Sequence, residues 1–209
     1  VDTTLRYPLF VKPAHLGSSI GISRVTNRLE LDNALEVAFH YDHKVLVEES
    51  VENLVEVTLP IIGNNELRPA LLERPLTSPE EFFDFDTKYM QGGKKGKKNG
   101  SKGSQGYSEL PAKLDKDLYA KAESVGLKMY RLLGCSGIAR VDMLIDEKTK
   151  EVYFNEVNPL PGSLYGHNWR AAGISNVELV QTLINLAEER FASFQKQNTV
   201  FSTNYLQQF

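Results

Sequence analysis

The sequence predicts an α+β fold made of two α+β lobes with mixed or antiparallel sheets. Segments typical of strands and helices follow one another irregularly, whereas a doubly wound parallel sheet needs a regular strand–helix alternation. Tight turns join two pairs of neighbouring strands, as antiparallel pairing allows. The chain has 209 residues, of which 41% are hydrophobic and 24% charged, so it can bury the core of one large domain or two small lobes.

The first part of the chain combines strands with one helix. Pro13 ends the first apolar run, and the small polar residues Ala14–Gly21 predict a turn after it. Asn27 is of a type that caps helices, and apolar residues continue from it to about His40. We expect strands at Tyr7–Lys12, Ile20–Val25 and Lys44–Glu49.

The second part adds more strands and two long helices. The helices are expected at about Lys116–Leu133, ending at Gly134, and at about Asn176–Gln195. The strands are expected at Val55–Ile62, Glu66–Arg74, Gly137–Ile145 and Glu151–Val157. The first two form a hairpin through Gly63-Asn64-Asn65. We therefore place a smaller lobe at about residues 7–60 and a larger one at about 61–209.

The composition excludes several classes of protein. A net charge of -3 gives no general reason to expect a nucleic acid or an anionic membrane as partner. The single cysteine, Cys135, rules out an internal disulfide. No apolar run approaches the roughly 20 residues of a membrane span. Because the chain begins with Val1 and not with Met, we expect the natural start of the protein to lie further upstream.

One segment, Gln91–Gly106, is rich in glycine and lysine and cannot form a packed core. A solvated, flexible loop is the simplest interpretation. The alternatives are steering of an anionic ligand or a nucleic-acid patch. Against the latter, no aromatic residues interleave with the lysines and the overall charge is negative.

A lysine followed by a glycine- and serine-rich turn is typical of phosphate binding. Lys12 ends a strand, and Gly17, Ser18, Ser19 and Gly21 follow it. Small residues let backbone N–H groups approach an anion, while hydroxyls and the lysine add donors and charge. The lysine precedes the glycines, so this is not a Walker loop. An ordinary hairpin loop is the alternative.

The strand around Val45–Val51 ends in acidic residues. Such a strand can present backbone groups to an adenine edge and a carboxylate, here Glu48, Glu49 or the later Glu56, to ribose hydroxyls. The alternative is a strand that runs out into solvent with charges at its tip.

The most informative cluster lies on the last two predicted strands. Arg140 and Asp142 are two residues apart, as are Glu156 and Asn158, so each pair shares a strand face. The turn between the strands brings Asp142 close to Glu156. Two carboxylates and an amide oxygen suit a hard cation such as Mg²⁺ that bridges phosphates, and Arg140 can meet a developing negative charge. A solvated strand face is the alternative.

A rigid turn, Pro159-Leu160-Pro161-Gly162-Ser163, follows Asn158 directly. The N–H of Gly162 could bind an oxyanion beside the predicted metal. A plain turn at the end of a strand is the alternative.

Four motifs in order make the chain resemble the D-alanine–D-alanine ligases of the ATP-grasp superfamily. The resemblance runs from about Pro8 to Arg190 and rests on residues 12–21, 83–89, 137–142 and 155–162. It implies the ATP-grasp fold, in which two lobes enclose ATP. It also implies a reaction in which ATP converts one carboxylate to an acyl phosphate that a second substrate's amine attacks.

The resemblance also implies roles for individual residues. Nucleotide contacts are expected at Lys12, Ser19, Glu48, Glu49, Ser50, Val51, Glu56, Lys88 and Asn155. Asp142, Glu156 and Asn158 match ligands of Mg²⁺ or Mn²⁺, with two ions expected. Arg140 and Gly162 match groups that stabilise the oxyanion. Ser18 matches a residue that helps to hold the acceptor, and Tyr89 stands beside Lys88 on the expected covering loop.

Two departures from the family pattern matter. The N-terminal substrate domain of the family is missing from this chain, so we expect that the chain alone does not ligate. The segment after Gly162 is also shorter than usual and leaves the second substrate open. His167 and Asn168 are the nearest candidates for contacts to its carboxylate, with a surface or packing role as the alternative for His167.

The expected product is D-Ala-D-Ala or a related dipeptide for peptidoglycan, made from D-alanine or a similar small molecule. A ligase with a different amino or hydroxy acid acceptor and a non-catalytic nucleotide-binding module are the alternatives. The resemblance is compatible with a homodimer of the full-length protein. ATP use and the lack of an export signal predict a cytoplasmic location, with neither nucleic acid nor membrane as partner.

Overall fold

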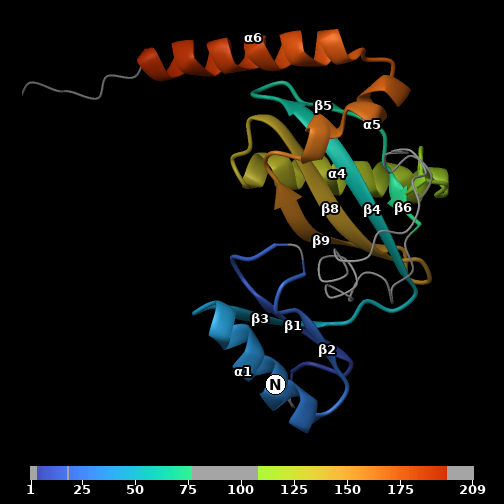
Figure 1. Ribbon diagram of the computed structural model, residues 1–209. Helices are drawn as coiled ribbons and strands as arrows, with labels where there is room; N and C mark the ends of the chain where they lie inside the picture. Colours follow the sequence, from blue (N-terminus) through green and yellow to red (C-terminus); the bar gives the residue numbers. More distant parts are fainter. Residues whose placement is uncertain (1–3, 18, 77–107, 197–209) are drawn as a thin grey trace, which may run out of the picture. The chain divides into compact units, whose positions relative to one another are not determined.

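The computed structural model describes residues 4–17, 19–76 and 108–196, which form two compact units. The first holds the described residues of Val1–Val55, Pro75–Ser108 and Ile145–Thr149. The second holds those of Glu56–Arg74, Glu109–Leu144 and Lys150–Phe209. Both combine helices with sheets, which confirms the predicted α+β class (Figure 1).

The first unit is a three-stranded antiparallel sheet with one helix. Its strands are β1 (Leu9–Pro13), β2 (Ser23–Val25) and β3 (Val45–Glu49), in the order β2-β1-β3. Helix α1 (Arg28–Tyr41) begins after Asn27, whose side chain accepts a hydrogen bond from the Glu30 N–H, as predicted.

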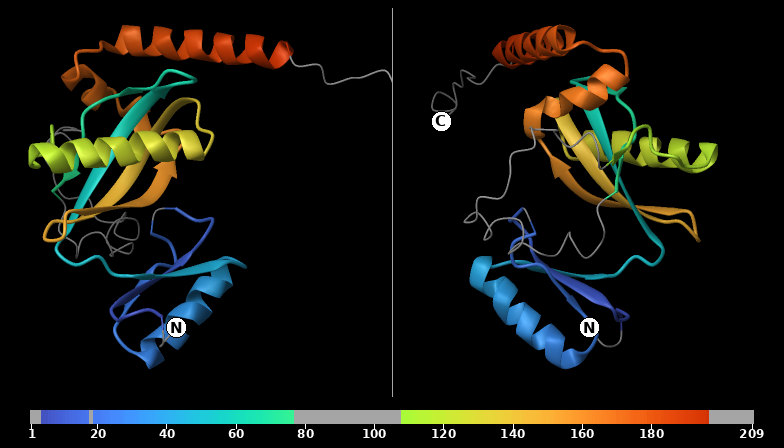
Figure 2. Two further views of the ribbon diagram at one scale, coloured as in Figure 1. Left: turned by 180° about the vertical axis from the view of Figure 1, so that it is seen from behind. Right: turned by 45° about the vertical axis from the view of Figure 1, so that its right-hand side comes forward.

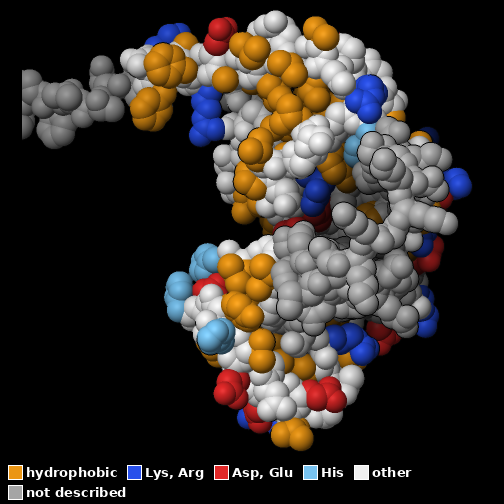
Figure 3. Space-filling view, viewed as in Figure 1, with side chains coloured by type: hydrophobic (Ala, Val, Ile, Leu, Met, Phe, Trp, Pro, Cys, Tyr) orange, Lys and Arg blue, Asp and Glu red, His pale blue; other side chains and the backbone are white. Residues whose placement is uncertain are grey.

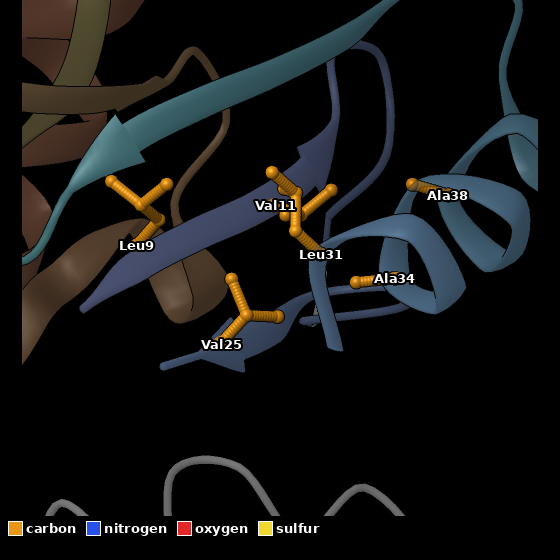
Figure 4. Packing of buried hydrophobic residues seen from close by; sticks show 6 residues of the cluster. All are labelled: Leu9, Val11, Val25, Leu31, Ala34 and Ala38. Atoms are coloured by element: carbon orange, nitrogen blue, oxygen red, sulfur yellow. The ribbon is translucent and has the colours of Figure 1, made fainter. Parts of the chain in front are cut away.

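Alternation along β1 decides which side chains face the helix. Leu9 and Val11 are fully buried and pack with Val25 of β2 and with Leu31, Ala34 and Ala38 of α1 (Figure 4). Burying a side chain of the size of leucine or valine contributes about 1.5–3 kcal/mol. Lys12 stands on the other face of the strand, opposite Leu46 in the register, and is free of this core.

The second unit is a four-stranded sheet covered on one face by a helix. The strands lie in the order β5 (Arg68–Pro69), β4 (Leu54–Gly63), β8 (Gly137–Asp146) and β9 (Glu151–Asn158). Helix α4 (Lys116–Leu132) crosses one face: it lies behind the strands in Figure 1 and in front of them in the left view of Figure 2. A β-carbon on Gly126 of α4 would stand 2.8 Å from the Leu59 side chain, so a larger residue here would make Leu59 shift.

Burial alternates along β8, with Ala139, Val141, Met143 and Ile145 buried. Met143 lies near Gly126, so the buried side chains of β8 face α4. Arg140 and Asp142 therefore project from the opposite face of the sheet.

The chain after β9 packs as a separate apolar cluster. A 3-10 turn, η1 (Gly162–Tyr165), leads into the short helix α5 (Gly166–Ala171) and the long helix α6 (Asn176–Gln195). Trp169 of α5 is fully buried together with Ile62, Ile138 and Leu179. None of the helices in the described part of the chain is long and apolar enough to cross a membrane.

Most predicted elements are confirmed within one or two residues, and α6 has the predicted bounds. The strand predicted at Glu66–Arg74 is wrong in its length. It is broken into β5, an isolated bridge from Glu73 to Thr58, and β6 (Arg74–Pro75), which pairs with β7 (Ser108–Glu109). The register shifts by one residue between the pair Ile61 and Pro69 and the pair Thr58 and Glu73, so an extra residue interrupts the ladder, and Pro69 supplies no N–H to it.

Candidate functional site

The predicted polar cluster of β8 and β9 is brought together. The Arg140 guanidinium donates two hydrogen bonds to Asp142, from Nε to Oδ1 at 2.7 Å and from Nη2 to Oδ2 at 2.6 Å. The Asn158 amide donates to Asp142 Oδ2 at 3.0 Å and to Glu156 Oε1 at 3.1 Å. One amide group therefore connects two carboxylates that come from neighbouring strands.

The surroundings of Asp142 disfavour the ionised form of its carboxyl group. Burial raises its pKa to about 6; the Arg140 guanidinium opposes the shift and the Glu156 carboxylate adds to it. Desolvation and a like charge both disfavour the ionised form. An additional cation would remove this disadvantage, because it neutralises both carboxylates at once.

The donor set of this cluster fits a divalent hard cation. Asp142 and Glu156 offer carboxylate oxygens, and a turn of the Asn158 amide would exchange its NH₂ group for its oxygen. The amide orientation follows from the hydrogen-bond network, so it adapts to what binds beside it. Asp142, Glu156 and Asn158 could therefore hold Mg²⁺, as predicted, while Arg140 leaves a positive charge next to the ion.

The turn after β9 places an aromatic ring beside Arg140. Ser163, Leu164 and Tyr165 have φ angles of 51°, 50° and 56°, in the left-handed region that non-glycine residues rarely adopt. The Tyr165 ring lies 5.3 Å from the Arg140 guanidinium carbon, and its hydroxyl lies 3.2 Å from the Thr58 hydroxyl. Burial raises the pKa of Tyr165, so the phenol stays neutral.

Gly162, expected at the oxyanion position, begins this turn. A β-carbon added to Gly162 would meet no described heavy atom within 4 Å. Open space next to its backbone is what the approach of a substrate oxygen requires. Its role as an oxyanion donor stays a prediction.

His167 and Asn168 are joined through an acid that sequence reasoning missed. The buried Glu73 accepts from Asn168 at 3.2 Å and lies 2.8 Å from His167 Nε2. The Asn168 amide also exchanges two hydrogen bonds with the Leu71 backbone, at 2.9 and 3.0 Å. Asn168 is fully buried, so its geometry favours a structural role over a substrate contact. A lone glutamate between two broken strands gives no sequence signal.

In the first unit, two predicted nucleotide contacts pair with each other. Lys12 Nζ lies 2.8 Å from Glu48 Oε2, and the side chains are 18% and 45% exposed. An anion near Lys12 would compete with Glu48 for its charge. The turn after Lys12 is tight: Ser19 has a φ of 59° and Gly21 a φ of 71°. Glycine at 21 fits this backbone without strain.

For the other residues predicted to contact the nucleotide, the structure shows contacts at the end of β3. The Glu49 carboxylate accepts the Arg6 N–H at 2.7 Å, and the Ser50 N–H donates to the Pro8 carbonyl at 3.0 Å. Both bonds hold the end of β3 against the start of β1. Val51 follows, and Glu56 lies in the second unit.

Other predicted positions fall on the opposite face or outside the described residues. Asn155 lies on β9, and strand alternation places it on the face opposite to Glu156. Ser18, Lys88, Tyr89 and the Gln91–Gly106 segment lie outside the described residues. Their expected roles stay predictions.

Comparison with known proteins identifies relatives of the chain. Residues 1–185 match the family model described as D-ala D-ala ligase C-terminus. A D-alanine–D-alanine ligase from Clostridium acetobutylicum is 37% identical over 194 residues, which cover 91% of this chain and 52% of that ligase. D-alanine–D-alanine ligase B from Clostridium tetani is 40% identical over 189 residues, which cover 88% of this chain and 48% of that ligase.

A solved structure resembles the fold as well. The VanG D-Ala:D-Ser ligase from Enterococcus faecalis matches with a TM-score of 0.71 and 32% identity, over 88% of this chain and 51% of that chain. The chain thus spans about half the length of the relatives that it matches.

Proposed function

The chain belongs to the family of D-alanine–D-alanine ligase C-terminal domains, and we propose that it is the ATP-binding part of an enzyme that joins D-alanine to a second D-alanine or a related acceptor. The observation that carries the proposal is the cluster on β8 and β9. It combines two carboxylates, an amide and a guanidinium on one sheet face, with Asp142 short of positive charge.

In this proposal, Asp142, Glu156 and Asn158 would hold Mg²⁺, which would supply positive charge for phosphoryl transfer. Lys12 leaves Glu48 to contact a phosphate. The N–H of Gly162 and the Arg140 guanidinium bind the oxyanion that forms when the acceptor amine attacks the acyl phosphate. The catalytic effect is mainly positioning and charge stabilisation.

Contacts with Asp142 and Tyr165 fix the orientation of the Arg140 guanidinium. Asp142 accepts from two of its nitrogens, and the Tyr165 ring covers the guanidinium carbon. A group held in this way needs little reorganisation when charge develops, which is the basis of electrostatic catalysis. Tyr165 acts here as a positioning residue.

The identity of the second substrate has a specific alternative, D-serine. The match to a D-Ala:D-Ser ligase shows that a similar chain occurs in a ligase named for D-serine. The segment after Gly162, shorter than expected for the usual ligase, leaves the acceptor open between D-alanine and another small acid. A screen of D-alanine, D-serine and D-lactate with the full-length protein, scored as ADP release, distinguishes them.

The proposed site is tested by calorimetric titration of ATP into the 209-residue chain, with and without Mg²⁺. Binding should strengthen with Mg²⁺, and Glu156→Ala should remove that gain. Glu151→Ala is the matched control: Glu151 lies on the same strand, where it pairs with Lys121 at 3.0 Å, outside the cluster. Equal Mg²⁺ effects in wild type and Glu156→Ala would refute the metal assignment.

Catalysis itself is tested on the full-length protein. Glu156→Ala should abolish ADP release that depends on both amino acids, and Glu151→Ala should retain it. ATP binding without turnover in the wild-type full-length protein would instead identify a nucleotide-binding module.

A further inference from the structure

The first unit contains a second group of ionisable side chains, none of which has been given a role above. Figure 3 shows histidine side chains gathering at the surface of this unit. His15 follows β1, while Asp42 and His43 form the turn between α1 and β3. One ligand atom from each of these three residues lies within 4.8 Å of the other two.

The three side chains converge through the nitrogens that metals use. His15 Nδ1 lies 2.9 Å from Asp42 Oδ2, and His43 Nδ1 lies 3.2 Å from Asp42 Oδ1. The two imidazole rings are stacked, with centroids 5.4 Å apart and planes inclined by 18°. Both rings therefore present the same nitrogen to one carboxylate.

Asp42 is fixed before any ligand arrives. The His15 N–H donates to its Oδ2 at 2.7 Å and the Lys44 N–H to its Oδ1 at 3.1 Å. These two bonds hold both oxygens in place, and the lone pairs that they leave face the two imidazoles, where an ion could replace the present contacts. The Asp42 side chain is 4% exposed, whereas those of His15 and His43 are 63% and 88% exposed. A rigid anion thus lies beneath two imidazoles that solvent can reach.

Two imidazole nitrogens and one carboxylate form a ligand set for borderline transition-metal ions. Zn²⁺ binds such sets with three protein ligands and a solvent molecule in the fourth position. Mg²⁺ prefers oxygen ligands and suits the cluster on β8 and β9 instead. The two clusters therefore differ in the class of ion that they select.

We propose that His15, Asp42 and His43 form a surface binding site for Zn²⁺ or a similar transition-metal ion. The ion binds the Nδ1 atom of each histidine and one oxygen of Asp42, and any proton on Nδ1 moves to Nε2 of the same ring or to solvent. Small rotations of the exposed rings suffice, because the backbone already places all three ligands.

Such an ion would tie two segments of the first unit together. His15 stands between Lys12 and Ser19, at the start of the glycine- and serine-rich turn, and Asp42 and His43 stand at the start of β3. The Ala14 N–H already donates to the Lys44 carbonyl at 2.9 Å, so the ion would reinforce an existing connection. The turn proposed to bind phosphate would become more rigid.

The proposal is tested by titrating ZnCl₂ into the 209-residue chain in excess Mg²⁺, which occupies the oxygen cluster. The wild type should bind one Zn²⁺ through this site. His15→Ala and His43→Ala should each weaken that binding by at least about tenfold. His40→Ala is the matched control, because His40 is exposed on the last turn of α1 and does not belong to the cluster.

A thermal denaturation series provides a second readout. Zn²⁺ should raise the unfolding temperature of the wild type and of His40→Ala but not that of His43→Ala. His43 is 88% exposed, so its replacement leaves the fold intact. Unchanged Zn²⁺ affinity in both His15→Ala and His43→Ala would overturn the proposal, as would a wild type that does not bind Zn²⁺ up to millimolar concentrations. The test of the proposed function, the Mg²⁺-dependent ATP binding of wild type and Glu156→Ala, is independent of these Zn²⁺ results.

Discussion

Asp42 in the first unit and Asp142 in the second are both largely buried and both contact a basic side chain, yet their pKa values move in opposite directions. Burial raises the pKa of each. For Asp42, backbone N–H donors from Lys44 and His15 outweigh burial and lower the pKa to about 2. For Asp142, burial prevails over Arg140, Glu156 adds to it, and the pKa rises to about 6.

The difference shows how the surroundings of a carboxylate assign its task. Fixed backbone donors satisfy Asp42 in the folded state, so it acts as an anchor of the turn before β3. The neighbours of Asp142 include another carboxylate as well as Arg140, so an added cation would stabilise its charge further. The direction of the pKa shift thus separates a carboxylate that backbone donors already satisfy from one that gains from an added cation.

Removing the charge of Asp142 should have the largest effect and tests the comparison of the two carboxylates most directly. Asp142→Asn should weaken Mg²⁺-dependent ATP binding by about 10–100-fold, because one of the charged metal ligands is lost. Calorimetry with and without Mg²⁺ measures the change. Asp146→Asn is the matched control on the same strand, since Asp146 accepts from the turn at Lys148 and Thr149 and from Asn53, outside the cluster. Equal losses in both variants would contradict the assignment.

The second largest effect should be that of pH on the cluster that contains Asp142. Asp142 has a folded pKa above its ordinary value of 3.8, so the folded state binds a proton more readily than the unfolded state up to about pH 6. Without metal, its contribution to stability therefore falls as the pH rises from about 4 to about 6. Mg²⁺ needs the ionised form, so Mg²⁺-dependent ATP affinity should rise about tenfold from pH 5 to pH 7. Calorimetry at both pH values measures the rise, and a flat profile would exclude Asp142 as a ligand.

Asp42 should show the opposite sign. Its folded pKa of about 2 lies below the ordinary value of 3.8, so its ionised form stabilises the fold above about pH 4, and this contribution is lost as the pH falls toward 2. Asp42→Asn should lower the unfolding temperature by several degrees at neutral pH, because an amide cannot accept from both backbone donors. Thermal denaturation at pH 7 and about pH 3 should show a smaller gap between variant and wild type in acid.

The smallest effect is expected at His43. An exposed ion pair contributes little, so His43→Ala should change the free energy of unfolding by less than about 0.5 kcal/mol in the absence of metal. Urea denaturation of the chain in a chelator measures this. A larger loss would mean that His43 is part of the anchor itself.

The sequence predicted the elements whose signals are local. Asn27 marked the start of α1, and β8 and β9 were predicted within a residue of their bounds. The convergence of Asp142, Glu156 and Asn158 followed from the period of two along strands and the tight turn between them. Contacts within one hairpin are therefore predictable from spacing.

Features that depend on long-range packing were not predictable. Helix α5 follows three left-handed residues of which none is glycine, so no composition signal announces it. Glu73 became part of the site only because its strand is interrupted by prolines and brought against Asn168, 95 residues away. The group formed by His15 and His43 depends likewise on strand pairing between β1 and β3.

The left-handed backbone at Ser163, Leu164 and Tyr165 also has a consequence for the stability of this chain. Each such residue costs about 1–2 kcal/mol relative to a relaxed backbone, a cost that glycine largely escapes. A population selected in the laboratory for heat resistance alone should therefore collect glycine at 163 and 164. Ser163 and Leu164 thus mark two positions in this turn where a smaller residue should raise stability.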